Sequence, residues 1–143
     1  KSMVLIKKTL LGILDKERHF ELTNSWIDGT RFHIEGEFVV QGATMPDFYM
    51  GHYYLLAAHT ETGQCYSYHL GQIRSKALCK KIGDIYENYL ACSFATMHLK
   101  GIDTKDWEVG SYELFVSFSY GGEIYSKRLD NKLTVKNKRC LWQ

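Results

Sequence analysis

The chain has 143 residues, of which 45 % are hydrophobic and 14 % aromatic, so it can bury a core and is not intrinsically disordered. Its 18 basic and 16 acidic residues leave a formal net charge of +2, which is too balanced to support nucleic-acid binding. No run of about 18 apolar residues occurs, so no membrane-spanning helix is expected. Ten Tyr, seven Phe and three Trp against one Pro favour β-strands. We therefore predict one soluble, mostly antiparallel β domain.

The first segment, residues 3–16, carries apolar residues at three- to four-residue steps and is predicted to form a short amphipathic helix. We assign residues 1–18 to this lead-in, in helical or extended form, and residues 19–143 to the β domain. Lys1 and Ser2 precede Met3 and are either residues added before a native start or part of a longer chain. The lead-in packs on the end of the β domain in one interpretation and contacts a membrane surface or a second domain in another.

From Phe20 the apolar period changes to two. Residues 20–26 lead to the pair Asp28-Gly29, which is typical of a tight turn, and residues 32–40 alternate strictly between apolar and polar side chains. We expect these two strands to form a hairpin. Residues 52–59 and 65–70 predict a second hairpin around the turn at residues 60–63. Residues 71–88 are ambiguous. Residues 76–82 are compatible with a helical turn, but Gly71 and Gly83 interrupt it, so we predict an irregular crossover between sheets.

The second half continues the same pattern. We expect strands at residues 89–99, 112–120 and 123–129, with a Gly121-Gly122 hairpin turn and a last short strand at Leu133 and Val135. Eight or nine strands with a turn about every ten residues are typical of a two-sheet antiparallel sandwich or a barrel.

Catalytic machinery is not recognisable in this sequence. The sequence contains no nucleophile elbow, no phosphate-binding glycine loop and no calcium-loop spacing. The cysteines at positions 65, 79, 92 and 140 form no Cys-x-x-Cys pair, so zinc is not expected. The six histidines are spread along the chain, and a metal site at His52, His59 and His69 would require the strand pair to bring them together. We predict no catalytic residue, no cofactor and no metal.

Compartment and surface charge allow two further expectations. The N-terminal apolar run is interrupted by Lys7 and Lys8 and has no small-residue cleavage site, so we expect reduced thiols and a cytoplasmic protein. Basic residues gather at both ends of the chain. They are either solvated, or they contact phosphate groups or the inner face of an anionic membrane. The C-terminal group comprises Lys132, Lys136, Lys138 and Arg139.

Aromatic side chains are the remaining candidates for a binding site. Aromatic rings with polar tips stack on sugar faces and anchor protein interfaces, although most of them fill cores. Trp107 lies in a loop among charged residues and is less easily explained as core. The candidate ligand-binding residues are Trp107, Trp26, Lys105 and Tyr120.

Two stretches together resemble a known group of domains. The strand at residues 34–40 (Ile-Glu-Gly-Glu-Phe-Val-Val) follows a Trp-x-Asp-Gly turn. Residues 99–107 (Leu-Lys-Gly-Ile-Asp-Thr-Lys-Asp-Trp) lead into Gly-Ser-Tyr-Glu-Leu at 110–114. Both resemble segments of the accessory immunoglobulin-like β-sandwich domains of teichoic acid glycerophosphotransferases and glycosyltransferases and of capsule enzymes. The resemblance covers most of residues 20–135, and its motifs are structural rather than catalytic.

The resemblance implies an immunoglobulin-like domain that serves a catalytic transferase domain by binding polymer or by oligomerising. Three hypotheses stay open. The first is a non-catalytic accessory domain that binds a cell-surface glycan or polyol-phosphate polymer. The second is a protein-interaction module or homo-oligomerisation module. The third is a small-ligand-binding barrel or a stand-alone enzyme.

Overall fold

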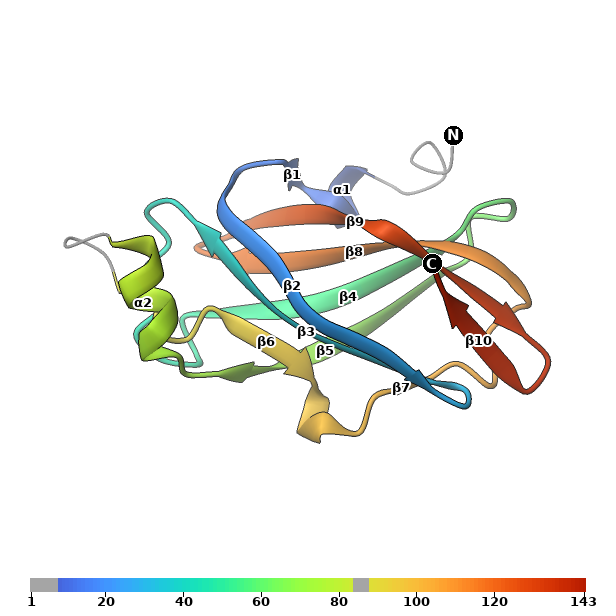
Figure 1. Ribbon diagram of the computed structural model, residues 1–143. Helices are drawn as coiled ribbons and strands as arrows, with labels where there is room; N and C mark the ends of the chain where they lie inside the picture. The colour runs from blue at the N-terminus through green and yellow to red at the C-terminus, as the bar shows by residue number, and fades with distance from the viewer. Residues whose placement is uncertain (1–7, 84–87) are drawn as a thin grey trace.

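The structure is a computed structural model that describes residues 8–83 and 88–143 (Figure 1). Strands dominate it. The elements are α1 (Lys8–Leu11), β1 (Ile13–Leu14), β2 (Glu17–Asp28), β3 (Arg31–Val40), β4 (Gly51–His59), β5 (Cys65–Ile73), α2 (Lys76–Ile82), β6 (Ser93–Thr96), the 3-10 turn η2 (Met97–Leu99), β7 (Ile102–Asp103), β8 (Gly110–Tyr120), β9 (Glu123–Lys136) and β10 (Arg139–Trp142). No described helix has the length and apolar character needed to cross a membrane.

The strands hydrogen-bond into one open mixed sheet of ten strands, in the order β1-β9-β8-β4-β5-β6-β3-β2, with β10 beside β9 and β7 beside β3. Among the described strands, β1 and β9 alone pair in parallel. The prediction of a mostly antiparallel β domain is thus confirmed. Two separate sheets are not confirmed, because β5 joins both halves: residues 65–69 pair with β4 and residues 70–73 pair with β6.

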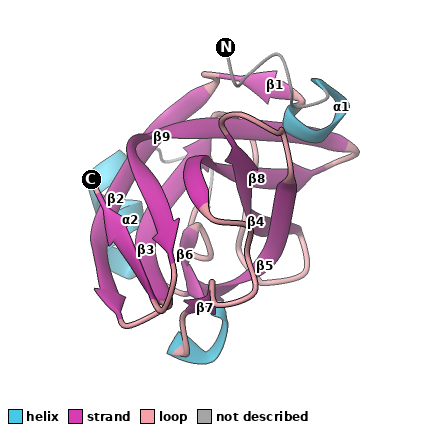
Figure 2. Ribbon diagram, turned by 90° about the vertical axis from the view of Figure 1, so that its right-hand side faces the viewer, coloured by secondary structure: helices cyan, strands magenta, loops and turns pink. Residues whose placement is uncertain are grey.

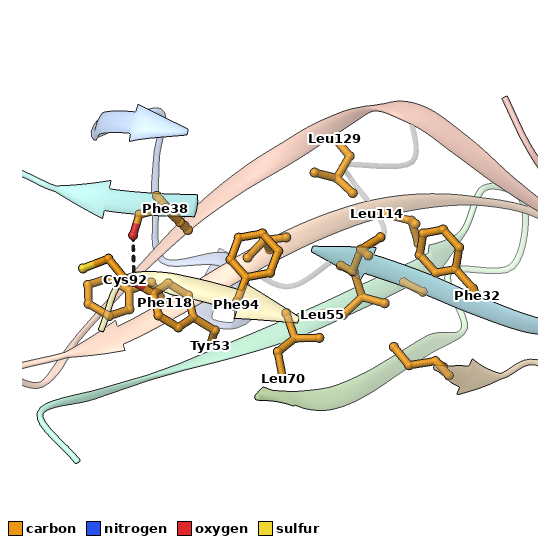
Figure 3. Close-up of a cluster of buried hydrophobic side chains, with 14 of the residues drawn as sticks. Phe32, Phe38, Tyr53, Leu55, Leu70, Cys92, Phe94, Leu114, Phe118 and Leu129 are labelled. Carbon is orange, nitrogen blue, oxygen red and sulfur yellow. Dashed lines mark hydrogen bonds between the residues drawn. The ribbon is translucent and has the colours of Figure 1, made fainter. Parts of the chain in front are cut away.

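The sheet curls so that β2 and β3 lie across β4, β8 and β9 (Figures 1 and 2). The main core fills the space between them with side chains from both sides (Figure 3). Phe38 of β3 contacts Tyr53 of β4 and Phe118 of β8, with ring centroids 6.2 Å and 6.0 Å apart. The Tyr53 hydroxyl donates to the Phe38 carbonyl at 2.7 Å, so this buried polar group is paired.

The predicted hairpins are present. β2 and β3 join through a turn in which Gly29 has φ +65°, and Gly121 and Gly122 have φ +58° and +81° between β8 and β9. Glycine adopts these positive angles without a Cβ penalty. The last predicted strands are corrected, because residues 123–136 form one long strand rather than two short ones.

The predicted helix at residues 3–16 is corrected within the described part of the chain; residues 3–7 lie outside it. Only Lys8–Leu11 is helical, since Gly12 turns the backbone at φ +63° and Ile13–Leu14 then pairs with β9. Leu11 packs on the outer face of the sheet, the face turned away from the main core, against Leu56 and Phe115.

Residues 71–83 are also more regular than predicted, and residues 84–87 of the predicted crossover lie outside the described residues. β5 extends to Ile73, and α2 begins after Ser75, whose hydroxyl accepts from the Leu78 backbone N–H at 3.1 Å. The helix ends at Gly83, with φ +71°. In contrast, the predicted strand at residues 89–99 is limited to Ser93–Thr96, because the chain leaves the sheet in η2.

Candidate binding site

Trp107 is part of the core. Its side chain is only 5 % exposed, and its ring stacks on Tyr66 with centroids 4.6 Å apart. Its indole N–H donates to the Tyr68 hydroxyl at 2.8 Å. The interpretation of Trp107 as a loop residue poorly explained by packing is therefore corrected: the loop folds back onto β5.

The other three sequence-based candidates lie apart from one another. Trp26 is 38 % exposed, but one face of its ring is covered by His33 at 4.5 Å. Tyr120 stacks on Phe118 with centroids 5.6 Å apart, at the end of β8 that is remote from Trp107. Lys105 is exposed in the loop after β7. Tyr120 and Trp107 therefore lie toward opposite ends of β8 and do not share one site.

The histidines of β4 and β5 converge in part. His52 and His69 lie edge to face with centroids 5.4 Å apart, and Tyr54 stacks on His69 at 5.0 Å. Partial burial and the neighbouring His52 lower the pKa of His69. His59 is buried elsewhere, with Nε2 hydrogen-bonded to the Val109 carbonyl at 3.0 Å, so it does not join the other two.

A groove that sequence reasoning missed lies where β5, β6 and η2 meet. Gly71 of β5 and Ala95 of β6 are paired in register. Because glycine has no side chain and alanine has only a methyl group, the outer face of the sheet is hollowed at this pair. The hollow has a volume of about 340 Å³. We call it the β5–β6 groove; its lining residues are Gly71, Gln72, Ile73, Ala95, Thr96, Met97, His98 and Leu99.

The walls of the β5–β6 groove are apolar and exposed. Ile73 is 46 % exposed, Met97 38 % and Leu99 62 %. Single exposed apolar residues are common, but a group of them around one hollow is typical of an interaction site. His69 lies two residues before Gly71 on the same strand, so its imidazole faces the same side as the groove.

The backbone beside the groove is strained. His98 and Leu99 have φ of +54° and +58°, in the left-handed region that residues other than glycine rarely adopt. Such a residue costs on the order of 1–3 kcal/mol, and these conformations cluster at functional sites. Here the strain turns Leu99 outward rather than into the core.

The lining of the groove is mostly apolar, with His98 as its one titratable residue and Thr96 as its one hydroxyl. The signal in the sequence was Gly71 inside a strand-like run, followed much later by the Met-His-Leu-Lys-Gly stretch at 97–101.

We compared the chain with known proteins, and no family model, no curated protein and no solved structure matches it.

Proposed function

We propose that this chain is a non-catalytic binding domain whose β5–β6 groove takes up apolar side chains of a partner protein. The observation that carries the proposal is the set of exposed apolar residues Ile73, Met97 and Leu99 around the groove. A partner that covers Leu99 removes its apolar surface from water, which offsets part of the cost of its left-handed backbone.

The size and chemistry of the groove favour a protein partner over a small ligand. A volume of about 340 Å³ is near the lower end of the roughly 300–1,000 Å³ of small-ligand sites, and this hollow is open to solvent. Methionine adapts its shape to different apolar surfaces, which suits a contact with a side chain of another protein. An interface of this type has an apolar centre and a polar rim.

A peptide-display selection tests the proposal. A random peptide library is selected on the full chain, and enriched peptides are titrated against wild type, Leu99→Ser and Gly71→Phe by calorimetry and amide NMR shifts. We expect peptides with a common apolar residue, affinities in the micromolar range and at least a tenfold loss in both variants. Val109→Ser is the matched control, because Val109 is 56 % exposed outside the groove. Peptides that bind Leu99→Ser as tightly as wild type would refute the proposal.

A second candidate function is binding of a glycan or polyol-phosphate polymer as an accessory domain of a cell-surface polymer transferase. It is supported by the free face of Trp26 and by the stacked Tyr54 and His69, since exposed rings stack on sugars. The packing of β2–β3 across β4–β8–β9 supports the related proposal of an immunoglobulin-like arrangement. Titration with glycerol-phosphate polymer at millimolar concentration should shift the Trp26 signals, and no saturable shift would count against it.

The remaining expectations are proposals with their own tests. A second copy of this chain is an alternative occupant of the groove, and a strictly monomeric mass in light scattering at high concentration would exclude it.

A further proposal is that the protein is cytoplasmic and contacts the inner face of the membrane through the β9–β10 hairpin. The basic residues of this hairpin support it. Sedimentation with phosphatidylserine vesicles tests this, and equal pelleting with neutral vesicles would contradict it. The hairpin residues are Lys132, Lys136, Lys138 and Arg139.

A further inference from the structure

A histidine and two glutamates meet on the outer face of β2 and β3, away from the β5–β6 groove. The ligand atoms of His19, Glu21 and Glu37 all lie within 4.8 Å of one another. His19 Nε2 is 2.8 Å from Glu37 Oε1. These side chains are positioned by strands rather than by loops, so their separation is fixed by the register of the hairpin.

The strand register of β2 and β3 explains why these three side chains lie close together. Glu21 stands directly opposite Glu37 in the antiparallel pair, and His19 stands opposite Val39 after a bulge in β2. His19, Glu21 and Glu37 therefore all point to the outer face, with His19 diagonal to Glu37. Two carboxylates directly opposite each other repel, so this pair requires a cation.

Lys81 of α2 now supplies that cation. Its Nζ is 3.0 Å from Glu37 Oε1 and 3.3 Å from Glu21 Oε1. Burial alone would raise the pKa of Glu37, but the hydrogen bonds from His19 and Lys81 outweigh it and hold the pKa below its usual value. The Lys81 side chain is 47 % exposed, so moving its ammonium into water costs little.

We propose that His19, Glu21 and Glu37 form a binding site for a divalent transition-metal ion, with Zn²⁺ as the reference ion and Lys81 as its displaceable competitor. One imidazole nitrogen and two carboxylate oxygens are ligands that Zn²⁺ accepts, and three protein ligands leave a position for water. The imidazole favours transition metals over Mg²⁺ and Ca²⁺. The doubly charged ion also neutralises both carboxylates, whereas Lys81 neutralises only one.

Cobalt absorption spectroscopy tests this site, because Co²⁺ substitutes for Zn²⁺ and has visible bands that report its ligand geometry. The full chain is titrated with CoCl₂ and then with ZnCl₂ as competitor. We expect saturable one-to-one binding of Co²⁺, displaced by Zn²⁺, and at least a tenfold loss of affinity in His19→Ala and in Glu37→Gln. Zinc should raise the unfolding temperature of wild type and not that of His19→Ala.

Lys81→Met separates a metal site from a surface ion-pair network. Removing the competitor should tighten Co²⁺ binding several-fold. If the cluster were only an ion-pair network, Lys81→Met would leave metal binding weak and unchanged, and that result would overturn the proposal.

Two controls test alternative ligand groups among the described residues. His69→Ala removes one member of the close pair His52–His69, and Cys79→Ser removes the half-buried thiol on the same helix as Lys81. Neither should change the Co²⁺ bands. Binding that disappears in either of these variants, or no bands at millimolar Co²⁺, would also overturn the proposal.

Discussion

The indole N–H of Trp142 in β10 donates to the hydroxyl of Ser25 in β2 at 2.8 Å. β2 is the last strand at one end of the open sheet, and β10 pairs with β9 near the other end. This hydrogen bond therefore ties together the two ends of the curled sheet, and the Trp142 ring packs on Phe32 of the core, with centroids 4.7 Å apart.

Removing this hydrogen bond should weaken the contact between the two ends of the curled sheet and lower the stability of the fold. We expect Trp142→Phe and Ser25→Ala each to lower the free energy of unfolding by about 1 kcal/mol, as one partly buried hydrogen bond is worth. The double variant should cost less than the sum of the two, because both substitutions remove the same bond. Urea unfolding followed by circular dichroism measures this. Fully additive losses would show that the two residues act independently.

Gly36 and Gly71 should respond in opposite ways to alanine. A Cβ at Gly36 would lie 2.6 Å from the Glu21 carbonyl oxygen and 2.6 Å from Phe94 Cζ, so Gly36→Ala should destabilise the fold by about 2 kcal/mol or more. At Gly71 the nearest atom would be the Ala95 carbonyl oxygen at 3.6 Å, an ordinary contact. Gly71→Ala should leave stability unchanged or raise it by up to about 1 kcal/mol. Thermal unfolding of the two variants checks both, and equal losses would contradict the difference in packing between Gly36 and Gly71.

The sequence predicted those elements that local pattern determines. Period-two alternation located β3, β5 and β8, an apolar run located β4, and the glycine turns located their hairpins. α2 was considered as a helical turn but not predicted, because it has only one turn of apolar period, with Leu78 and Ile82 buried, and because Gly83, which ends the helix, was interpreted as an interruption. Local pattern therefore located strands more reliably than this short helix.

The candidate sites depend on which strands become neighbours. The β5–β6 groove requires Gly71 to pair with Ala95, and the metal-ligand cluster requires the register shift between Leu22 and Asn24 that sets Glu21 opposite Glu37. Trp107 was misjudged for the same reason, since its burial comes from the tyrosines of β5 rather than from its charged sequence neighbours. Registers between distant segments cannot be deduced from alternation alone.

Relief of the strained turn beside the groove should stabilise the protein. His98 has φ +54°, which glycine adopts freely, so His98→Gly should raise the free energy of unfolding by about 0.5–1 kcal/mol. His98→Ala keeps the left-handed penalty and is the control that should show no gain. Chemical denaturation compares the two. A gain in the alanine variant equal to that in the glycine variant would mean that the side chain, rather than the backbone, carries the cost.

Cys92 should make stability depend on pH in the alkaline range. Its thiol is fully buried, and burial raises its pKa from 9.0 to about 12. Below about pH 8 the thiol is mostly neutral in both states and contributes little pH dependence. As the pH rises further, the unfolded chain loses this proton while the folded chain keeps it, so stability falls by up to about 1.4 kcal/mol per pH unit until the folded thiol titrates.

Cys92→Ala isolates this effect. At pH 7 the variant should be less stable by about 1 kcal/mol, because it leaves a small cavity in the core. Above pH 9 the difference from wild type should shrink and then reverse, since the variant has no thiol to deprotonate on unfolding. Burial and, to a lesser extent, the neighbouring Cys92 also raise the pKa of Tyr53, so both proteins carry Tyr53→Phe in this comparison to remove its share of the alkaline loss. Urea unfolding between pH 7 and 11 measures the difference, and a constant gap would show that Cys92 titrates alike in the folded and unfolded states.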